Sequence, residues 1–254
     1  EKLARTCQAG FYAAPCLMAL AGMFLLLDLG NVERVWLVVF TPFQSVLSVG
    51  AWLVALLTAV SGALAVWALV ASEVPRAALW TCCVLGGACA LGVMGYTGLL
   101  LSDMVSIDFW HTPWLIALFM ASSLSCGAAV IVGLDAALSP PSCEVSRVAW
   151  GAGAVLGCIE AAVLVAFLAV QSGYTQTARA SCEALLAGSL ALTFWVGVCA
   201  VGLAVPLALH AVGRLLPGRA AMMASSLGVL AGGLLLRYCI VAAASFTPLA
   251  LGAI

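Results

Sequence analysis

The sequence is poor in charged residues. Only 7% of its 254 residues are charged and 65% are apolar, whereas an ordinary soluble domain carries about 25% charged residues. This composition excludes a soluble fold. Nine basic and ten acidic residues give a formal net charge of −1, so the chain has neither a basic surface for nucleic acid nor an acidic tail.

Histidine and lysine are scarce as well. The two histidines, His111 and His210, fall near segment ends on opposite sides of the membrane, whereas b-type haems in membranes use axial ligands inside the bundle. We therefore expect no haem in this chain. A retinal Schiff base needs a lysine within the membrane, and the only lysine is Lys2 at the amino terminus.

The eleven cysteines lack the spacing of a metal site. No C-x-x-C pattern occurs, so the ligand sets of an iron–sulfur cluster and of structural zinc are missing. Most cysteines lie inside apolar runs, where a thiol packs as a small apolar side chain. Only Cys7, Cys143 and Cys182 lie near helix ends, and the sequence indicates no pairing among them.

Apolar residues are grouped in long segments. A window of about 19 residues picks out seven of them, at 7–29, 45–71, 77–101, 113–138, 148–170, 184–210 and 220–246. Seven spanning helices of about 20 to 25 residues use nearly all of the apolar positions. We predict an all-α, polytopic transmembrane helix bundle, with residues 1–254 forming a single integral membrane domain.

Basic residues are distributed unevenly over the connections between these segments. One side carries Lys2, Arg5, Arg76, Arg147, Arg214 and Arg219, and the other carries Arg34 and Arg179. Cytoplasmic loops are enriched in lysine and arginine, so the first side is predicted to be cytoplasmic. The connections 30–44, 102–112 and 171–183 then face outward with the carboxyl terminus.

Two ionisable residues lie well inside the predicted helices. Glu160 is near the middle of the fifth segment, and Arg237 is about two-thirds of the way outward along the seventh. Such residues cost about 2.5 to 3.5 kcal/mol to insert, which makes them functional candidates. Glycines on the same helix faces, including Gly233, indicate that both point into the bundle. With Asp135 near the cytoplasmic end of the fourth segment, they form either a stepped proton path or a buried ion pair that joins two helices.

Two further polar residues share one depth near the outer interface. Asp28 ends the first segment, and Tyr96 lies at the outward end of the third. A tyrosine at this depth is either a member of the aromatic belt or a functional hydrogen-bonding group.

Several strings resemble a known family in collinear order over nearly the whole chain. They are LLLDLGNVER (25–34), SVGAW (48–52), GYTGLLL (95–101), FWHTPWL (109–115), FWVGVCAVGLAVP (194–206) and GGLLLRYCIVAA (232–243). Together they resemble the NrfD/polysulfide reductase membrane-subunit family.

This resemblance implies an integral subunit of the cytoplasmic (inner) membrane of a prokaryote. It would bind a quinone, menaquinone or ubiquinone, near the outer face and hold no haem or iron–sulfur cluster of its own. Its partners would be a subunit with four iron–sulfur clusters and, beyond it, a molybdopterin catalytic subunit. The family has eight helices, and its first has no counterpart before Cys7, so we expect seven here.

The resemblance also implies roles for individual residues. Tyr96 is the YTG tyrosine that contributes to the quinone pocket, and Glu160 and Arg237 correspond to proton-path positions. A quinone needs an apolar slot and one or two hydrogen-bonding groups, and Tyr96 with a neighbouring acid meets that need. We predict a quinone site bounded by Tyr96 and Asp28, with Arg237 behind them.

Three functions remain open from the sequence. The first is a quinone-binding subunit that exchanges electrons with an iron–sulfur partner and is coupled to proton movement. The second is a proton-coupled transporter whose Glu160 and Arg237 line a substrate path. The third is a purely structural anchor for an exported enzyme. The terminal substrate and the direction of electron flow would depend on the partner subunits.

Overall fold

A computed structural model describes residues 2–28, 45–70, 76–138, 144–213 and 218–244. These residues form helices joined by turns, and none of them is in a β-strand. Six of the helices are long and apolar enough to cross a membrane, and the apolar stretch Ala14–Leu27 forms a shorter one. The prediction of an all-α, polytopic transmembrane protein is confirmed.

The chain divides into two compact units, residues 1–100 and 101–254. The first contains α1 (Lys2–Asp28), α3 (Val46–Val70) and most of α4 (Arg76–Ser102). Helix α1 packs on α3. Ser45 starts α3 with a reciprocal cap, because its hydroxyl accepts from the Ser48 N–H at 3.1 Å while the Ser48 hydroxyl accepts from the Ser45 N–H at 3.3 Å.

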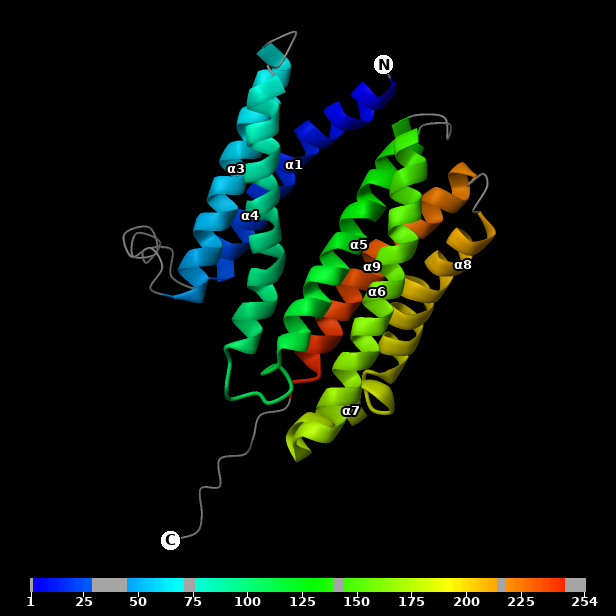
Figure 1. Ribbon diagram of the computed structural model, residues 1–254. Coiled ribbons are helices and arrows are strands. Elements are labelled where there is room, and N and C mark those ends of the chain that lie inside the picture. Colours follow the sequence, from blue (N-terminus) through cyan, green and yellow to red (C-terminus); the bar gives the residue numbers. More distant parts are fainter. Residues whose placement is uncertain (1, 29–44, 71–75, 139–143, 214–217, 245–254) are drawn as a thin grey trace. The chain divides into compact units, whose positions relative to one another are not determined.

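The second unit is a helical bundle (Figure 1). It comprises α5 (Pro113–Leu138), α6 (Glu144–Tyr174), α7 (Gln176–Leu186), η2 (Thr193–Ala204), α8 (Val205–Val212) and α9 (Arg219–Ala242). Helix α5 packs against both α6 and α9, and α9 also packs against η2. The backbones of η2 and α9 touch at Gly202 and Gly232, since a Cβ on Gly202 would lie 2.6 Å from the Gly232 Cα. Small residues allow this close crossing of membrane helices.

The chain between α6 and α8 differs from the prediction. The connection expected at 171–183 contains the end of α6 and most of α7, and Thr175 caps α7 by accepting from the Ala178 N–H at 3.1 Å. The expected segment 184–210 begins in α7, turns, and then forms the π-helix η2, which runs into α8. Pro206 stands at the start of α8, where its ring disfavours a regular α-helical turn before it. Hydropathy alone reveals neither α7 nor the π-helical form of η2. Helix α7 is polar, and the hydropathy of a segment does not distinguish a π-helix from an α-helix.

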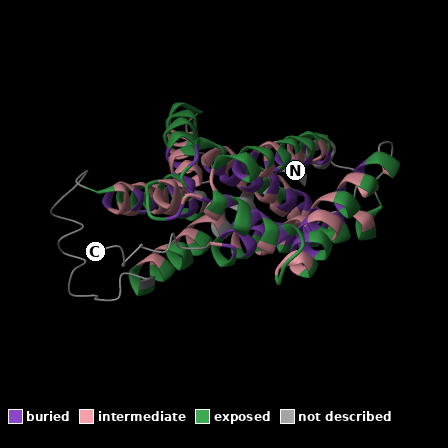
Figure 2. Ribbon diagram, turned by 90° about the horizontal axis from the view of Figure 1, so that it is seen from below, coloured by how far each residue is buried: buried purple, intermediate pink, exposed green. Residues whose placement is uncertain are grey.

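Buried residues of the second unit form two clusters with a polar band between them. The larger cluster lies toward the end that carries α7, called here the α7 end, and includes Phe109, Phe167 and Phe194. The smaller lies toward the opposite end, around Trp150 and Met222. The buried polar residues of the band are Ser122, Ser125, Glu160, Ser225 and Ser226. Buried residues line the interior while exposed ones lie outside (Figure 2).

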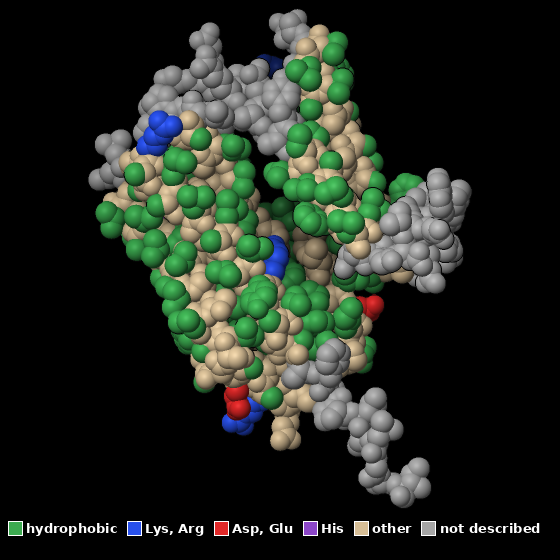
Figure 3. Space-filling model, turned by 180° about the vertical axis from the view of Figure 1, so that it is seen from behind, with side chains coloured by type: hydrophobic (Ala, Val, Ile, Leu, Met, Phe, Trp, Pro, Cys, Tyr) green, Lys and Arg blue, Asp and Glu red, His purple; other side chains and the backbone are tan. Residues whose placement is uncertain are grey.

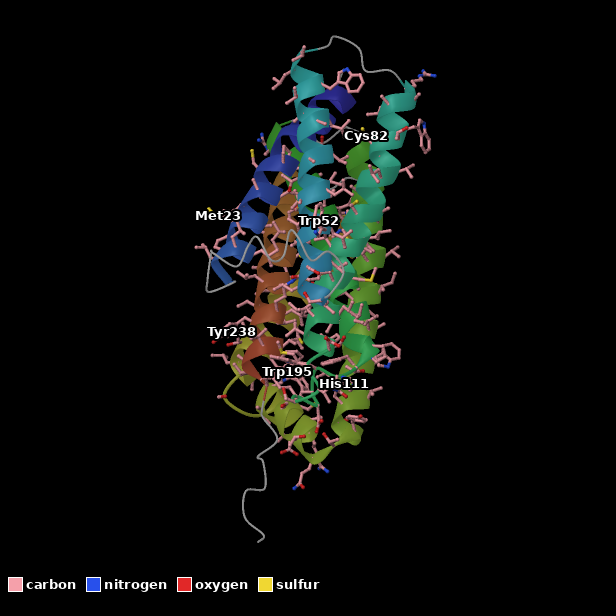
Figure 4. The ribbon with its side chains drawn as sticks, turned by 90° about the vertical axis from the view of Figure 1, so that its left-hand side faces the viewer. Met23, Trp52, Cys82, His111, Trp195 and Tyr238 are labelled. Atoms are coloured by element: carbon pink, nitrogen blue, oxygen red, sulfur yellow. The ribbon has the colours of Figure 1, made fainter. Side chains whose placement is uncertain are left out.

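The exposed surface is mainly apolar, as expected for helices in lipid. Hydrophobic side chains spread over the face in Figure 3, and few charged side chains interrupt them. At the α7 end, Trp195 and Tyr238 are about half exposed, and Figure 4 shows both of them and His111 toward that end. Tryptophan and tyrosine at such positions are typical of a membrane–water interface.

Candidate functional site

Glu160 is the central residue of the polar band. It lies on α6 with 6% of its surface exposed. Ser122 and Ser125 of α5 lie next to its carboxyl group, and Arg237 of α9 interacts with it electrostatically. Three helices therefore meet at this carboxyl, and each contributes a polar side chain.

The guanidinium group of Arg237 makes its hydrogen bonds to groups other than the Glu160 carboxyl. Its Nη1 donates to the Gly233 carbonyl oxygen at 3.0 Å, and its Nη2 donates to the Ser123 hydroxyl at 2.8 Å. The guanidinium carbon also lies 5.5 Å from the centre of the Phe119 ring, within the range of a cation–π contact.

The two charged groups thus interact through space and do not form a close ion pair. Among the residues that the structure describes, the salt bridge is formed by Arg179 and Glu183 on α7, at 3.1 Å. Ser123 of α5 holds Arg237, whereas Ser122 and Ser125 of the same helix lie beside Glu160. The arrangement leaves the Glu160 carboxyl next to two serine hydroxyl groups, and a proton path through these residues stays a prediction.

Asp135 lies at the other end of α5. It is fully buried, and it makes an interaction within the structure. Ten residues separate it from Ser125, which corresponds to about 15 Å along a helix. The stepped series predicted from the sequence therefore has a gap between Asp135 and Glu160, and these two side chains do not form one site.

Tyr96 belongs to the first unit, where α3 and α4 meet. It is 7% exposed, and its ring lies directly against Gly50, so that a Cβ on Gly50 would overlap the ring. Gly50 is the glycine of SVGAW and Tyr96 is the tyrosine of YTG, so the structure joins these two motifs. Tyr96 is thus a packed residue, unlike the exposed side chains of an aromatic belt.

These observations do not bring the three residues of the predicted quinone site together. Arg237 lies in the second unit and Tyr96 in the first, and the side chain of Asp28, the last residue of α1, lies outside the described residues. The site formed by these three residues stays a prediction.

Polar residues at the α7 end fix the segment between α4 and α5. The Gln171 amide donates to the carbonyl oxygens of Asp108 and Phe109 at 3.0 and 2.7 Å. The Asp108 carboxylate accepts from the hydroxyls of Thr175 and Thr177 at 3.0 and 2.6 Å. These contacts were not predicted, because the sequence shows only polar residues in two separate connections.

Within the described part of the chain, no three His, Cys, Asp or Glu side chains form a group suited to a metal ion. The described cysteines are free thiols. Cys182 on α7 is buried, and burial raises the pKa of its thiol to about 11, with the neighbouring Glu183 carboxylate adding to the effect. This thiol stays protonated at neutral pH.

The sequence motifs named above belong to one known protein family. The family described as "Polysulphide reductase, NrfD" matches residues 1–249. The chain belongs to the NrfD family. The resemblance seen in the sequence is thereby confirmed, and the buried contact between Gly50 and Tyr96 lies within the matched residues.

Two relatives of this NrfD-family protein are similar over part of their length. A polysulfide reductase subunit of Wolinella succinogenes is 34% identical over 159 residues, which cover 59% of this protein and 49% of the relative. Protein NrfD of Escherichia coli (strain K12) is 34% identical over 163 residues, or 60% and 49% of the two proteins. The chain thus spans about half the length of these relatives. No solved structure matches it.

Proposed function

We propose that this NrfD-family chain is the quinone-binding membrane subunit of a respiratory oxidoreductase complex. It exchanges electrons between the membrane quinone pool, menaquinone or ubiquinone, and an iron–sulfur subunit wired to a molybdopterin catalytic subunit. The observation that carries the proposal is the buried Tyr96, seated on Gly50 at the meeting point of two family motifs. Its phenol can hydrogen-bond a quinone carbonyl within apolar surroundings.

The α7 end is the proposed docking side for the iron–sulfur subunit. Electrons would pass directly from the quinone to the nearest cluster, so the partner must bind close to the pocket. The segment 102–112 follows α4 directly in the chain, and hydrogen bonds from Gln171, Thr175 and Thr177 hold its residues Asp108 and Phe109 at the α7 end. The connection 30–44, predicted to face the same side, lies outside the described residues.

Composition of the purified complex tests this proposal. A complex isolated through a tag on this subunit should contain iron, acid-labile sulfide and molybdenum in fixed ratios to it. Isolation of the subunit with neither metal, from membranes in which it is stably inserted, would favour the transporter.

Surface labelling tests which side the α7 end faces. Arg179→Cys places a thiol on an exposed part of α7, and we expect a membrane-impermeant maleimide to label it from outside the cell. The neighbouring Cys182 gives little background at pH 8, because the thiolate is the reactive form and its pKa is about 11. Arg219→Cys, at the opposite end, should be labelled only in inverted vesicles. The reverse pattern would overturn both the orientation and the docking side.

Gly50→Ala tests whether the packing of Tyr96 matters. The added methyl group would overlap the tyrosine ring, and misplacing a reacting group by about 1 Å can cost about 100-fold in rate. We expect quinol oxidation or quinone reduction to fall by up to about that factor while the complex assembles. Gly62→Ala on the same helix is the control, since its Cβ would meet nothing within 4 Å. Equal turnover in the two variants would remove Tyr96 from the proposed site.

A further inference from the structure

A small cavity lies beside the polar band, among α5, α6, α8 and α9. Its polar lining consists of Ser125, His210, Ser225 and Ser226, and Gly153 forms part of its wall. The volume that the centre of a water molecule can occupy in this cavity is about 10 Å³. This is room for one water. A water in a buried site needs two to four polar partners, and this lining supplies them.

His210 presents a hydrogen-bond acceptor to this cavity. Its Nδ1 lies 2.5 Å from the Pro206 carbonyl oxygen, and a carbonyl oxygen only accepts, so in the neutral ring Nδ1 carries the hydrogen and Nε2 does not. The ring is stacked on Trp150, with centroids 3.9 Å apart, which fixes its orientation. A Cβ on Gly153 would lie 3.1 Å from Nε2, so the absence of a side chain there keeps this nitrogen accessible.

Ser226 gives a second, independent indication of a water molecule in this cavity. Its side chain is 4% exposed, and its hydroxyl oxygen makes no hydrogen bond to any residue in the described ranges. Buried hydroxyl groups without a protein partner commonly bind an ordered water. Because Ser226 lines the same cavity as His210, one molecule can serve both groups.

Ser125 connects the cavity to the candidate site. It lines the cavity, and it also lies next to the Glu160 carboxyl group. The cavity and the carboxyl are therefore separated by one hydroxyl group. His210, on α8, lines the same cavity.

We propose that a single water bound between Ser226 and His210 completes a proton relay from Glu160 through Ser125 to His210. In one passage the Glu160 carboxyl loses its proton to the Ser125 hydroxyl oxygen, Ser125 passes its own proton to the water, and the water passes one to His210 Nε2. One O–H bond breaks at Glu160 and one N–H bond forms at His210, while the serine and the water keep their numbers of protons. This relay rests on the proposed function, because it supplies the proton movement of that function.

The test uses the assembled complex and two glycine variants of α6. Gly153→Ala places a methyl group beside His210 Nε2 and should expel the water. Gly151→Ala adds the same methyl group to the same helix where it meets nothing within 4 Å. A third variant, Ser226→Ala, removes a partner of the water without adding volume and serves where Gly153→Ala fails to assemble.

Two measurements are compared. A cryo-electron microscopy map at water-resolving resolution should show one ordered water near Ser226 and His210 in the wild type and in Gly151→Ala, and none in Gly153→Ala. Proton uptake in reconstituted vesicles should slow by about 100-fold in Gly153→Ala and stay unchanged in Gly151→Ala.

Each outcome decides a separate point. An empty cavity in a wild-type complex that takes up protons would overturn the water site. Loss of the water with wild-type uptake in Gly153→Ala would overturn the relay. A wild-type complex that shows the water but no quinone-dependent electron transfer would refute the proposed function, and the relay with it.

Discussion

Tyr96→Phe should lower quinone-dependent turnover by about one to two orders of magnitude. The substitution removes a single hydroxyl group, which is the proposed donor to a quinone carbonyl, and lost acid–base assistance commonly has an effect of this size or larger. The ring itself remains and still fills the space over Gly50. The subunit should therefore insert and assemble normally, so that the loss appears in turnover measured with purified complex and a soluble quinol analogue.

Tyr238→Phe provides the matched control. Tyr238 is 58% exposed on α9, as is typical of an interfacial tyrosine, and its hydroxyl group should contribute nothing to turnover. If the two variants were equally active, Tyr96 would be a packing residue and the quinone site would have to lie elsewhere.

Glu160→Gln should separate electron transfer from proton movement. Glutamine keeps the size and polarity of the side chain beside Ser122 and Ser125, but it cannot release and rebind a proton. We expect proton uptake in reconstituted vesicles to fall by about 100-fold or more, while the amount of assembled complex stays near that of the wild type.

Glu183→Gln makes the same chemical change on α7, where the carboxylate is exposed and paired with Arg179. It should leave proton uptake intact. A purely structural Glu160 predicts the opposite result for Glu160→Gln, namely poor assembly with normal coupling in the complex that survives. Full coupling in a well-assembled Glu160→Gln variant would end the relay hypothesis.

Hydropathy predicted most of the helices, because each span needs about 20 apolar residues and little else. The exceptions have physical reasons. Helix α7 is short and polar and depends on the Thr175 cap, so no apolar run reveals it. The π-helical form of η2 reflects backbone hydrogen bonding, which composition does not encode.

Glycines on the helix faces of Glu160 and Arg237 predicted that both side chains point into the bundle, and in the structure Glu160 is buried and Arg237 is half-buried. Their partners on α5 could not be derived in the same way. Helix α5 carries three neighbouring serines, Ser122, Ser123 and Ser125. The rotation and register of α5 against α6 and α9 determine which serine lies beside Glu160 and which lies beside Arg237. That register follows from side-chain packing along three helices and has no local signal in the sequence.

The cavity beside His210 illustrates the same difficulty. His210 looked like a residue near the end of a segment, and only the stacking on Trp150 and the opposing Gly153 show that it faces inward. The contact between Gly50 and Tyr96 is likewise a meeting of two helices. In each case the residues were visible in the sequence, but their contacts depend on tertiary packing.

Electron transfer from quinol into the partner subunit tests the central claim most directly. The complex would be isolated through this subunit with its iron–sulfur clusters oxidised, mixed with a reduced menaquinol analogue, and frozen for electron paramagnetic resonance. The proposed function predicts reduced-cluster signals in the wild type, and signals that develop about 10- to 100-fold more slowly in Tyr96→Phe. If dithionite reduces the clusters but quinol does not, and if reduced clusters transfer no electrons to added quinone, the protein is a structural anchor and the account is contradicted.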